Sequence, residues 1–175
     1  MTIHSEHPFL PPEPDRNPVR RLRGMLASPV TVLTAEQDGQ RAGLTVSSVL
    51  VVDGEPGEVL AIVDPSSDLH DAVLASNRAV LNLLGRDDWQ LADAFGYVAP
   101  APGGPFRLAQ WQPSEWGPVL AGATAWAGCR LTAPGASRTV GWGVELRLTI
   151  EAVTVGRDEA PLVHHRGRYR TIAQL

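Results

Sequence analysis

Two polar segments at the ends of apolar runs have the composition of a ligand site. The first, Gly43-Leu-Thr-Val-Ser-Ser48, places three hydroxyl side chains in a stretch otherwise typical of a β-strand. Hydroxyls and backbone groups at a strand end can hold a polar planar ligand. The second, Asp64-Pro-Ser-Ser67, precedes a helical pattern, where free N–H groups and the helix dipole attract phosphate. The simpler interpretation is that Ser66 or Ser67 only caps that helix.

Standard catalytic and metal-binding patterns do not occur in the sequence. It has no Gly-rich dinucleotide loop, Walker loop, nucleophile elbow or zinc-protease helix. His164 and His165 are adjacent, and neighbours on a strand point to opposite faces, so we expect no shared metal. The single cysteine, Cys129, excludes a disulfide within the chain and a cysteine-based zinc site. It lies in an apolar run, which predicts a buried, unreactive thiol.

The elements that must position these residues are mostly strands. Predicted strands are residues 30–34, 43–52, 59–63, 79–84 and 124–132, with turns at Asp38-Gly39 and at 53–57. Predicted helices are short: residues 18–27 after the Asn17-Pro18 cap, 68–76, and one containing Trp89 to Phe95. The three arginines of the first helix are most simply a solvated face. Residues 99–105 form an irregular loop of the kind that often covers a site.

A long alternating pattern is the clearest signal in the chain. The apolar residues that recur at every second position are Val140, Trp142, Val144, Leu146, Leu148, Ile150 and Ala152. Polar residues such as Glu145 and Arg147 fall between them. This period of two predicts a long strand with one buried face, bent to serve two parts of a barrel. Six or seven antiparallel strands hide their edges most naturally by closing into such a barrel.

Length and composition limit the class of protein. The chain has 175 residues, enough for one domain, and residues 1–17 read as a proline-rich arm before a domain over 18–175. The net charge is −4, so nucleic acid is not an expected partner. Neither a secretory signal nor an apolar run long enough to cross a membrane occurs, and we expect a cytoplasmic protein.

Five fragments in this order resemble the flavin reductase-like family, the FMN-binding split barrels. They are Gly43–Ser48, Val63–Ser67, Val80–Asn82, Gly117–Gly122 and the ending Pro161–Arg170, within a match over about residues 22–170. The resemblance implies an all-β fold with minor helix: a six-stranded antiparallel Greek-key split barrel. It also implies a homodimer that binds FMN, or FAD, and takes hydride from NADH or NADPH.

The resemblance assigns cofactor contacts residue by residue. Thr45, Val46, Ser47 and Ser48 would meet the ring and ribityl chain, and Ser66 and Ser67, after Asp64, the phosphate. Asn82 would lie close to the cofactor, and His164, Arg166 and Tyr169 beside it.

Two departures from the family pattern stand out. Where relatives often carry a threonine with a basic neighbour after the serines, this chain has Leu69 and Asp68, and an aspartate repels phosphate. Where many relatives have an aspartate–histidine pair on the long strand, a gapless match gives Glu145 and Leu146. Arg86 or the arginines of the first helix could compensate for the first loss.

Three functions follow from this sequence. The leading one is an NAD(P)H:flavin oxidoreductase that supplies reduced flavin to a monooxygenase component. Positioning the nicotinamide beside the flavin needs no protein acid or base, so a missing histidine does not exclude it. The second is a non-catalytic flavin-binding or storage protein, and the third is an interaction protein whose barrel has lost its ligand.

Overall fold

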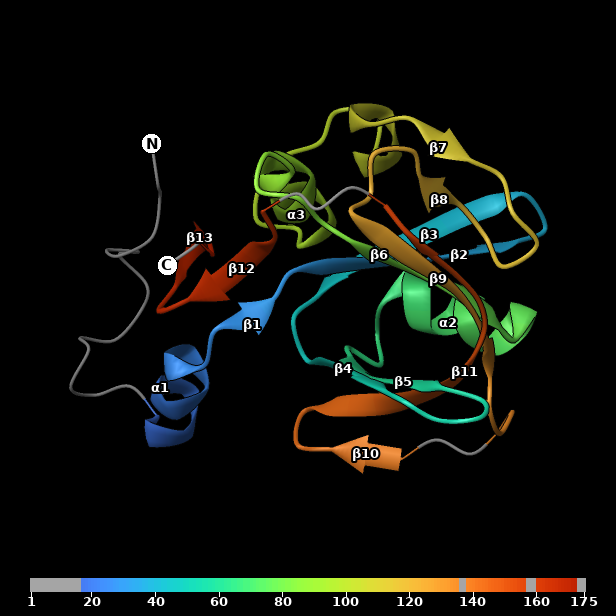
Figure 1. The fold of residues 1–175 in the computed structure, drawn as a ribbon, viewed down its shortest axis with the longest axis horizontal. Helices are drawn as coiled ribbons and strands as arrows, with labels where there is room; N and C mark the ends of the chain where they lie inside the picture. The colour runs from blue at the N-terminus through green and yellow to red at the C-terminus, as the bar shows by residue number, and fades with distance from the viewer. Residues whose placement is uncertain (1–16, 136–137, 157–159, 173–175) are drawn as a thin grey trace.

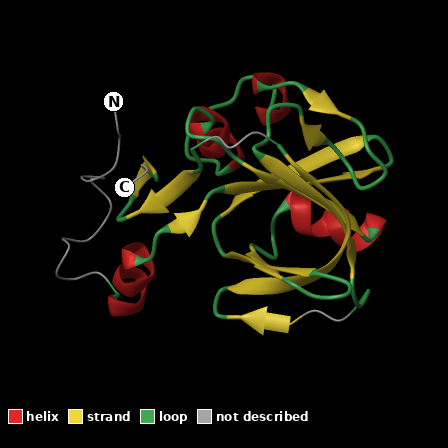
Figure 2. Cartoon of the chain, viewed as in Figure 1, coloured by secondary structure: helices red, strands yellow, loops and turns green. Residues whose placement is uncertain are grey.

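The structure, a computed structural model, describes residues 17–135, 138–156 and 160–172, so the predicted arm lies almost wholly outside the described residues. Strands dominate, and short helices lie around and inside the curled sheet (Figure 2). In chain order the elements are α1 Pro18–Met25, β1 Ser28–Pro29, β2 Thr31–Gln37, β3 Gln40–Val46, β4 Val49–Val52, β5 Glu58–Val63, α2 Asp68–Ser76, β6 Arg78–Leu83, α3 Trp89–Phe95, the 3-10 turn Pro105–Leu108, β7 Trp111–Gln112, β8 Val119–Leu120, β9 Ala125–Leu131, β10 Arg138–Val140, β11 Gly143–Val155, β12 Leu162–His165 and β13 Arg168–Thr171.

The main sheet curls until its two outermost strands come from consecutive parts of the chain. Its order is β3-β2-β6-β9-β11-β5-β4, with β10 beside β11, and the pairings are antiparallel. The end strands β3 and β4 are separated only by Ser47 and Ser48, and α2 lies within the curve (Figure 1). The split barrel predicted from the sequence is confirmed. The sheet has eight strands, and six remain if β3 and β4 count as one bent strand and β10 is left out.

The long strand begins three residues later than its alternation predicts, at Gly143. Val144, Leu146 and Leu148 are buried in the barrel as expected. Val140 and Trp142 are not: Val140 belongs to β10, and Trp142 is fully exposed in the turn before β11. Gly141, at φ 60°, reverses the chain there, and alternation continues across the reversal. A bulge between Ile150 and Ala152 then bends β11, which pairs with β5 in its first half and β9 in its second.

The run predicted as one strand over residues 43–52 is two strands. Residues up to Val46 pair with β2, and residues from Val49 pair with β5. The break falls at Ser47-Ser48, where the backbone stops pairing with β2 and begins to pair with β5. We call this dipeptide the β3–β4 junction.

The local signals at turns and helix starts are confirmed. The Asn17 side chain accepts a hydrogen bond from Val19 N, and Ser67 caps α2 by accepting from His70 N. Asp38 and Gly39 both have positive φ, as a tight hairpin turn requires. In the described part of the chain, no helix is long and apolar enough to cross a membrane.

Two apolar clusters pack against the two faces of the sheet. The cluster inside the barrel includes Leu33, Val59, Leu69, Leu81, Cys129, Leu146 and Leu148. The cluster outside it, under α3, includes Val30, Val32, Leu84, Leu91, Phe95 and Leu162. Strand β2 is buried on both faces because it lies between the two clusters. Gly43 on β3 has no side chain where the ring of Phe95 packs, so α3 can approach the sheet closely.

A buried amide joins β6, β2 and β8. The Asn82 side chain donates to Val32 O at 3.1 Å and to Thr34 Oγ1 at 3.2 Å, and its Oδ1 accepts from Leu120 N at 2.8 Å. Asn82 has no exposed surface. Its hydrogen-bonding groups are all engaged, which is what makes burial of an amide tolerable.

The C-terminal hairpin forms a small sheet of its own, in the order β1-β12-β13. Leu162 fastens it to the barrel: its carbonyl accepts from Val30 N, and its N–H donates to Leu84 O, both at 3.0 Å. The hairpin therefore lies beside α1 at one end of the barrel (Figure 1).

Cys129 is expected to resist alkylation in the native protein. Burial, with the nearby charge of Glu151, raises the pKa of its thiol to about 12, so almost no thiolate exists at pH 8. Iodoacetamide at pH 8, followed by mass measurement, should leave the native chain unmodified and label it once in guanidinium chloride. Labelling of the native chain at the rate of a free thiol would contradict the burial.

Replacing Asn82 is expected to destabilise the fold strongly. Asn82→Ala leaves buried backbone groups of β2 and β8 unpaired, which should lower the free energy of unfolding by about 3 kcal/mol. Urea denaturation measures this loss. Gln40→Ala, at an exposed amide of β3, is the control and should change stability little. Similar midpoints for the two variants would show that the amide network is not needed.

Candidate functional site

The β3–β4 junction lies where the curled sheet changes neighbours. Thr31 Oγ1 donates to Val46 O at 2.7 Å, just before the junction, and Ile62 N donates to Ser48 O at 2.9 Å, just after it. The side chains of Ser47 and Ser48 are half-buried. Two hydroxyls therefore stand at the split in the sheet, anchored from both sides by backbone.

The four residues predicted to meet a flavin ring divide into two kinds. Thr45 donates its hydroxyl proton to Ala92 O of α3 at 2.7 Å, and Val46 is buried in the barrel core. Thr45 thus fixes α3 against β3, and Val46 fixes the end of the strand. The partly exposed side chains of Ser47 and Ser48 are the two of the four that can contact a ligand.

The predicted phosphate loop lies next to this junction, because β4 pairs with β5 and β5 leads directly into Asp64. The loop satisfies its own donors. Asp64 Oδ1 accepts from Ser66 N at 2.8 Å and from Ser66 Oγ at 2.7 Å, and Ser67 Oγ donates to Asp64 O at 2.7 Å.

The charges around this loop are negative. The N–H and hydroxyl of Ser66 hold the pKa of the Asp64 carboxyl below its usual value, so it is ionised at neutral pH. Asp68 and Asp71 add carboxylates in the first turn of α2. A phosphate at Ser66 and Ser67 has to compete with Asp64 for their donors, and it meets three carboxylates.

Asn82, which was predicted to lie close to the cofactor, is not at the junction surface. It lies inside the sheet, opposite Val32, with its hydrogen-bonding groups engaged by protein atoms. Its position in the structure is that of a crosslink under the site.

The C-terminal hairpin brings an imidazole and a phenol to the same end of the barrel. Tyr169 donates its hydroxyl to Asp93 Oδ1 of α3 at 2.8 Å, and burial, more than this contact, raises the pKa of the phenol above its usual value. The rings of His164 and Tyr169 meet edge to face, with centroids 5.9 Å apart. Burial, and then the charges of Arg23 and His165, lower the pKa of His164, so its ring is neutral at pH 7.

Three residues at this end of the barrel were not predicted from the sequence to belong to the site. Arg23 of α1 donates from Nη2 to Ser47 Oγ at 3.2 Å, although the arginines of α1 read as a solvated face. Ala92 and Asp93 of α3 receive the bonds from Thr45 and Tyr169. The only sequence signal for Arg23 is a helix with three arginines and no acidic residue. For α3 the partners are 47 and 76 residues away and leave no local pattern.

Arg166 lies at the turn of the hairpin. Its φ is 51° and that of Gly167 is 75°, the signature of a tight hairpin turn. Its N–H donates to Gly24 O at 2.8 Å, so the turn rests on the end of α1. The β3–β4 junction, α1, α3 and the hairpin are thus linked by hydrogen bonds into one site.

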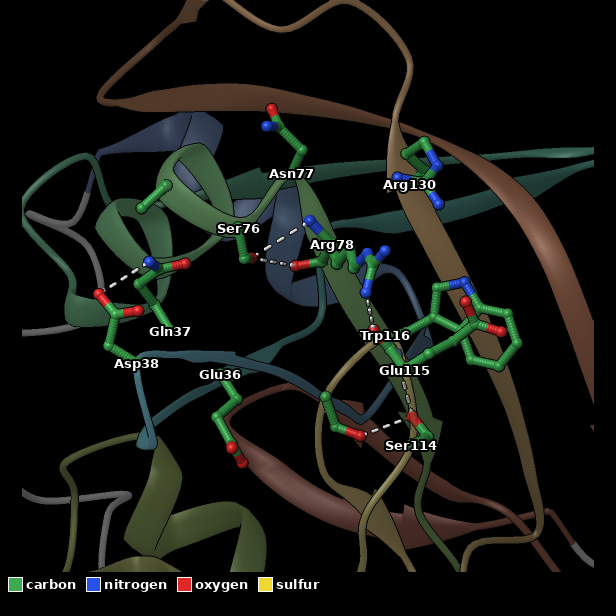
Figure 3. A pocket seen from close by; sticks show the side chains of 12 residues that line it. Glu36, Gln37, Asp38, Ser76, Asn77, Arg78, Ser114, Glu115, Trp116 and Arg130 are labelled. Carbon is green, nitrogen blue, oxygen red and sulfur yellow. Dashed lines mark hydrogen bonds between the residues drawn. The ribbon is translucent and has the colours of Figure 1, made fainter.

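A separate polar pocket of about 480 Å³ lies at the far end of β2, beside the end of α2 (Figure 3). None of the site residues predicted from the sequence lines it. Its charged groups are largely engaged: Arg78 donates to Glu115 O at 2.8 Å, and Arg130 pairs with Glu151 at 2.6 Å. Trp116 Nε1 also donates to Glu151, at 2.7 Å. These contacts make a structural network.

Two curated relatives are similar to this protein over most of its length. The chain is 31% identical over 165 residues to an FMN reductase (NADH), RutF, of Ancylobacter novellus, covering 93% of this chain and 88% of the relative. It is 30% identical over 157 residues, covering 89% of this chain and 80% of the relative, to the reductase component of a 4-nitrophenol 4-monooxygenase/4-nitrocatechol 2-monooxygenase of Rhodococcus opacus.

Solved structures share the fold. The NADH:FAD oxidoreductase SgcE6 of Streptomyces globisporus superposes with a TM-score of 0.79 at 23% identity, covering 94% of this chain and 96% of that one. Flavin reductase PheA2 gives a TM-score of 0.79 at 22% identity, covering 89% and 97%. The sequence model of the flavin reductase like domain matches residues 22–173. The chain therefore belongs to the flavin reductase-like family.

Proposed function

We propose that this protein is a flavin reductase that binds FMN at the β3–β4 junction and transfers hydride to it from NADH. The observation that carries the proposal is the junction of two half-buried serines. Arg23 of α1 donates to Ser47, the neighbouring Thr45 is bonded to α3, and α3 is bonded to the C-terminal hairpin. The family match and the relatives named as FMN reductases (NADH) support the same reaction. When bound, the flavin accepts hydride from the nicotinamide and carries the two electrons onward.

The junction fits the polar edge of a flavin ring. That edge carries N–H and C=O groups that need partners once water is excluded. Ser47 and Ser48 offer hydroxyls, and the neutral ring of His164 offers both a donor and an acceptor. Arg23 orients Ser47, and Thr45 and Tyr169 hold α3 and the hairpin in place. Arg166, at the hairpin turn, lies beside this edge.

The phosphate of FMN has a weaker support at Ser66 and Ser67. We propose that these serines and the first amides of α2 receive the phosphate, since a helix start offers free N–H groups. Binding there requires Asp64 to release Ser66, and Asp68 opposes it by charge. The affinity for FMN should therefore be modest and sensitive to salt.

The chain does not place a histidine where many relatives have one on the long strand. Leu146 is buried in the barrel, and Glu145 lies on the other face near Arg138, 3.8 Å from it. We propose that His164 is the imidazole of this site instead. The same absence makes a non-catalytic flavin-binding protein the second candidate. The cytoplasmic location stays a prediction.

We also propose that reduced flavin is delivered to a monooxygenase component. The relatives include a protein named as the reductase component of a 4-nitrophenol 4-monooxygenase/4-nitrocatechol 2-monooxygenase, which supports this proposal. A reductase whose junction lies at one end of an open barrel can release its flavin to such a partner.

A homodimer accounts for the exposed apolar surface. Helix α1 buries none of its residues, and Leu22, Met25 and Leu26 are exposed. On the barrel, Leu50 and Val51 of β4 are exposed as well. Exposed apolar side chains in this number are typical of a protein–protein contact.

Titration of FMN and assay of NADH oxidation test the flavin site. Ser47→Tyr fills the junction and should weaken FMN binding at least about tenfold, because the bulky ring takes the space of the ligand. Thr139→Tyr, on the exposed β10, is the matched control and should bind as wild type. Equal affinity in both variants would place the flavin elsewhere. FMN binding without NADH oxidation would favour the storage function, and no binding in any protein would overturn the proposal.

Light scattering tests the dimer. The wild-type mass should be twice 18.7 kDa at micromolar concentration. Leu50→Lys places a charge in the apolar surface and should shift the protein toward monomer, whereas Leu108→Lys, at another exposed leucine, should not. A wild-type mass of one chain would contradict the proposal.

A further inference from the structure

On the two segments beside the junction, arginines gather for which the described part of the chain shows no acidic partner. They are Arg20, Arg21 and Arg23 of α1 and Arg166, Arg168 and Arg170 of the hairpin, and all six are exposed. Residues 17–25 and 162–171 contain no aspartate or glutamate, although the whole chain carries a net charge of −4. Within the described ranges, none of these six arginines forms an ion pair; the arginines that pair with acidic residues lie elsewhere in the chain. We call these six residues the arginine cluster.

The two segments are joined in space. Arg166 N donates to Gly24 O, and Ser28, just after α1, pairs with His164 of β12. Figure 1 shows α1 beside β1 and the β12–β13 hairpin at one end of the molecule. The charges therefore belong to one surface, and an anion bound there would relieve their mutual repulsion.

This surface reaches the proposed flavin site through Arg23. Its guanidinium uses one N–H for Ser47, which leaves the other donors for a ligand. Arg20 lies one turn earlier on α1, so both side chains project from the same face of the helix. The positive field extends to His164, whose pKa is lowered first by burial and then by the charge of Arg23.

The opposite side of the junction repels anions. Asp64, Asp68 and Asp71 carry the charge there, and Asp64 occupies the donors of Ser66. A diphosphate beside the junction is therefore attracted toward the arginine cluster and away from the Asp64 loop. The chain has no lysine, and the planar guanidinium pairs with two phosphate oxygens at once.

We propose that Arg23 and Arg20, with the hairpin arginines, bind the diphosphate of a dinucleotide whose redox ring lies at the β3–β4 junction. The shared chemistry is a nucleoside diphosphate, which NADH and FAD both contain and FMN lacks. The inference rests on the proposed function for the position of the ring. It adds a subsite that selects dinucleotides.

Direct binding of ADP tests the subsite without any redox reaction. ADP carries the diphosphate and no redox ring, and adenosine is the uncharged comparison. Isothermal titration calorimetry should show that the wild type binds ADP but not adenosine, with a Kd that rises with salt. Arg23→Gln should raise that Kd about tenfold, because a charge-assisted hydrogen bond is lost. Arg20→Gln, which does not touch Ser47, should raise it as well.

Arg41→Gln is the matched control. It removes the same charge at the far end of the barrel, where Arg41 pairs with Glu36, and should leave ADP binding unchanged. Equal ADP affinity in Arg23→Gln, Arg20→Gln and Arg41→Gln would overturn the proposal, and would leave the arginine cluster to an acidic protein partner. If wild type binds ADP through Arg23 but neither binds nor reduces flavin, the subsite stands and the proposed function fails.

Two further comparisons identify the source of the diphosphate. If the source is NADH, Arg20→Gln raises the KM for NADH about tenfold and leaves the KM for reduced nicotinamide mononucleotide unchanged. If the source is FAD, Arg20→Gln weakens FAD binding and leaves FMN binding unchanged. Either result supports the subsite. Equal weakening of FMN and FAD by Arg20→Gln, with no change for NADH, would show that the cluster acts only on the flavin that FMN and FAD share and would overturn the proposal.

Discussion

One constraint governs the architecture: residues 40–52 must supply both end strands of the same curled sheet. Strand β3 pairs with β2, and β4 pairs with β5. The chain therefore has to switch from one pairing strand to another within two residues. Regular pairing cannot continue through that change. Ser47 and Ser48 fill the gap, with their backbone held on either side and their hydroxyls left at the split. Closure of the barrel and the ligand site are consequences of the same step.

The two sides of the junction differ in charge, and this difference gives the site a direction. The loop from Asp64 to α2 carries carboxylates and satisfies its own donors. Helix α1 and the hairpin carry only positive charge. Because interactions between exposed charges act over about 10 Å in ordinary buffers, both fields reach a ligand at the junction. A ligand is therefore oriented before any close contact forms.

The sequence predicts local features of this fold far better than long-range ones. Caps at Asn17 and Ser67 and the turn at Asp38-Gly39 are set by neighbouring residues, and the structure confirms them. Alternation predicts the buried face of β11 correctly from Val144 to Leu148. It is wrong at Trp142, because a pattern of period two does not record a chain reversal.

The candidate site shows the same limit. Its residue types were visible in the sequence, since serines and an ending rich in histidine and arginine stand out at strand ends. Their partners were not. Thr45 donates to a carbonyl of α3, and the Asn82 amide bonds to two strands, β2 and β8. Arg23 reaches Ser47 from a helix whose arginines are predicted to be solvated. Each of these contacts depends on how distant segments pack, which no local pattern encodes.

Helix α3 makes the two chemical halves of the site depend on each other. Ala92 accepts from Thr45, and the next residue, Asp93, accepts from Tyr169, so one turn of helix holds both β3 and the C-terminal hairpin. Phe95 packs on Gly43 and presses that turn against the sheet. A shift of α3 would move the serines relative to His164. Since hydride transfer depends on the distance between two rings more than on any acid or base, this turn controls the geometry that the reaction needs.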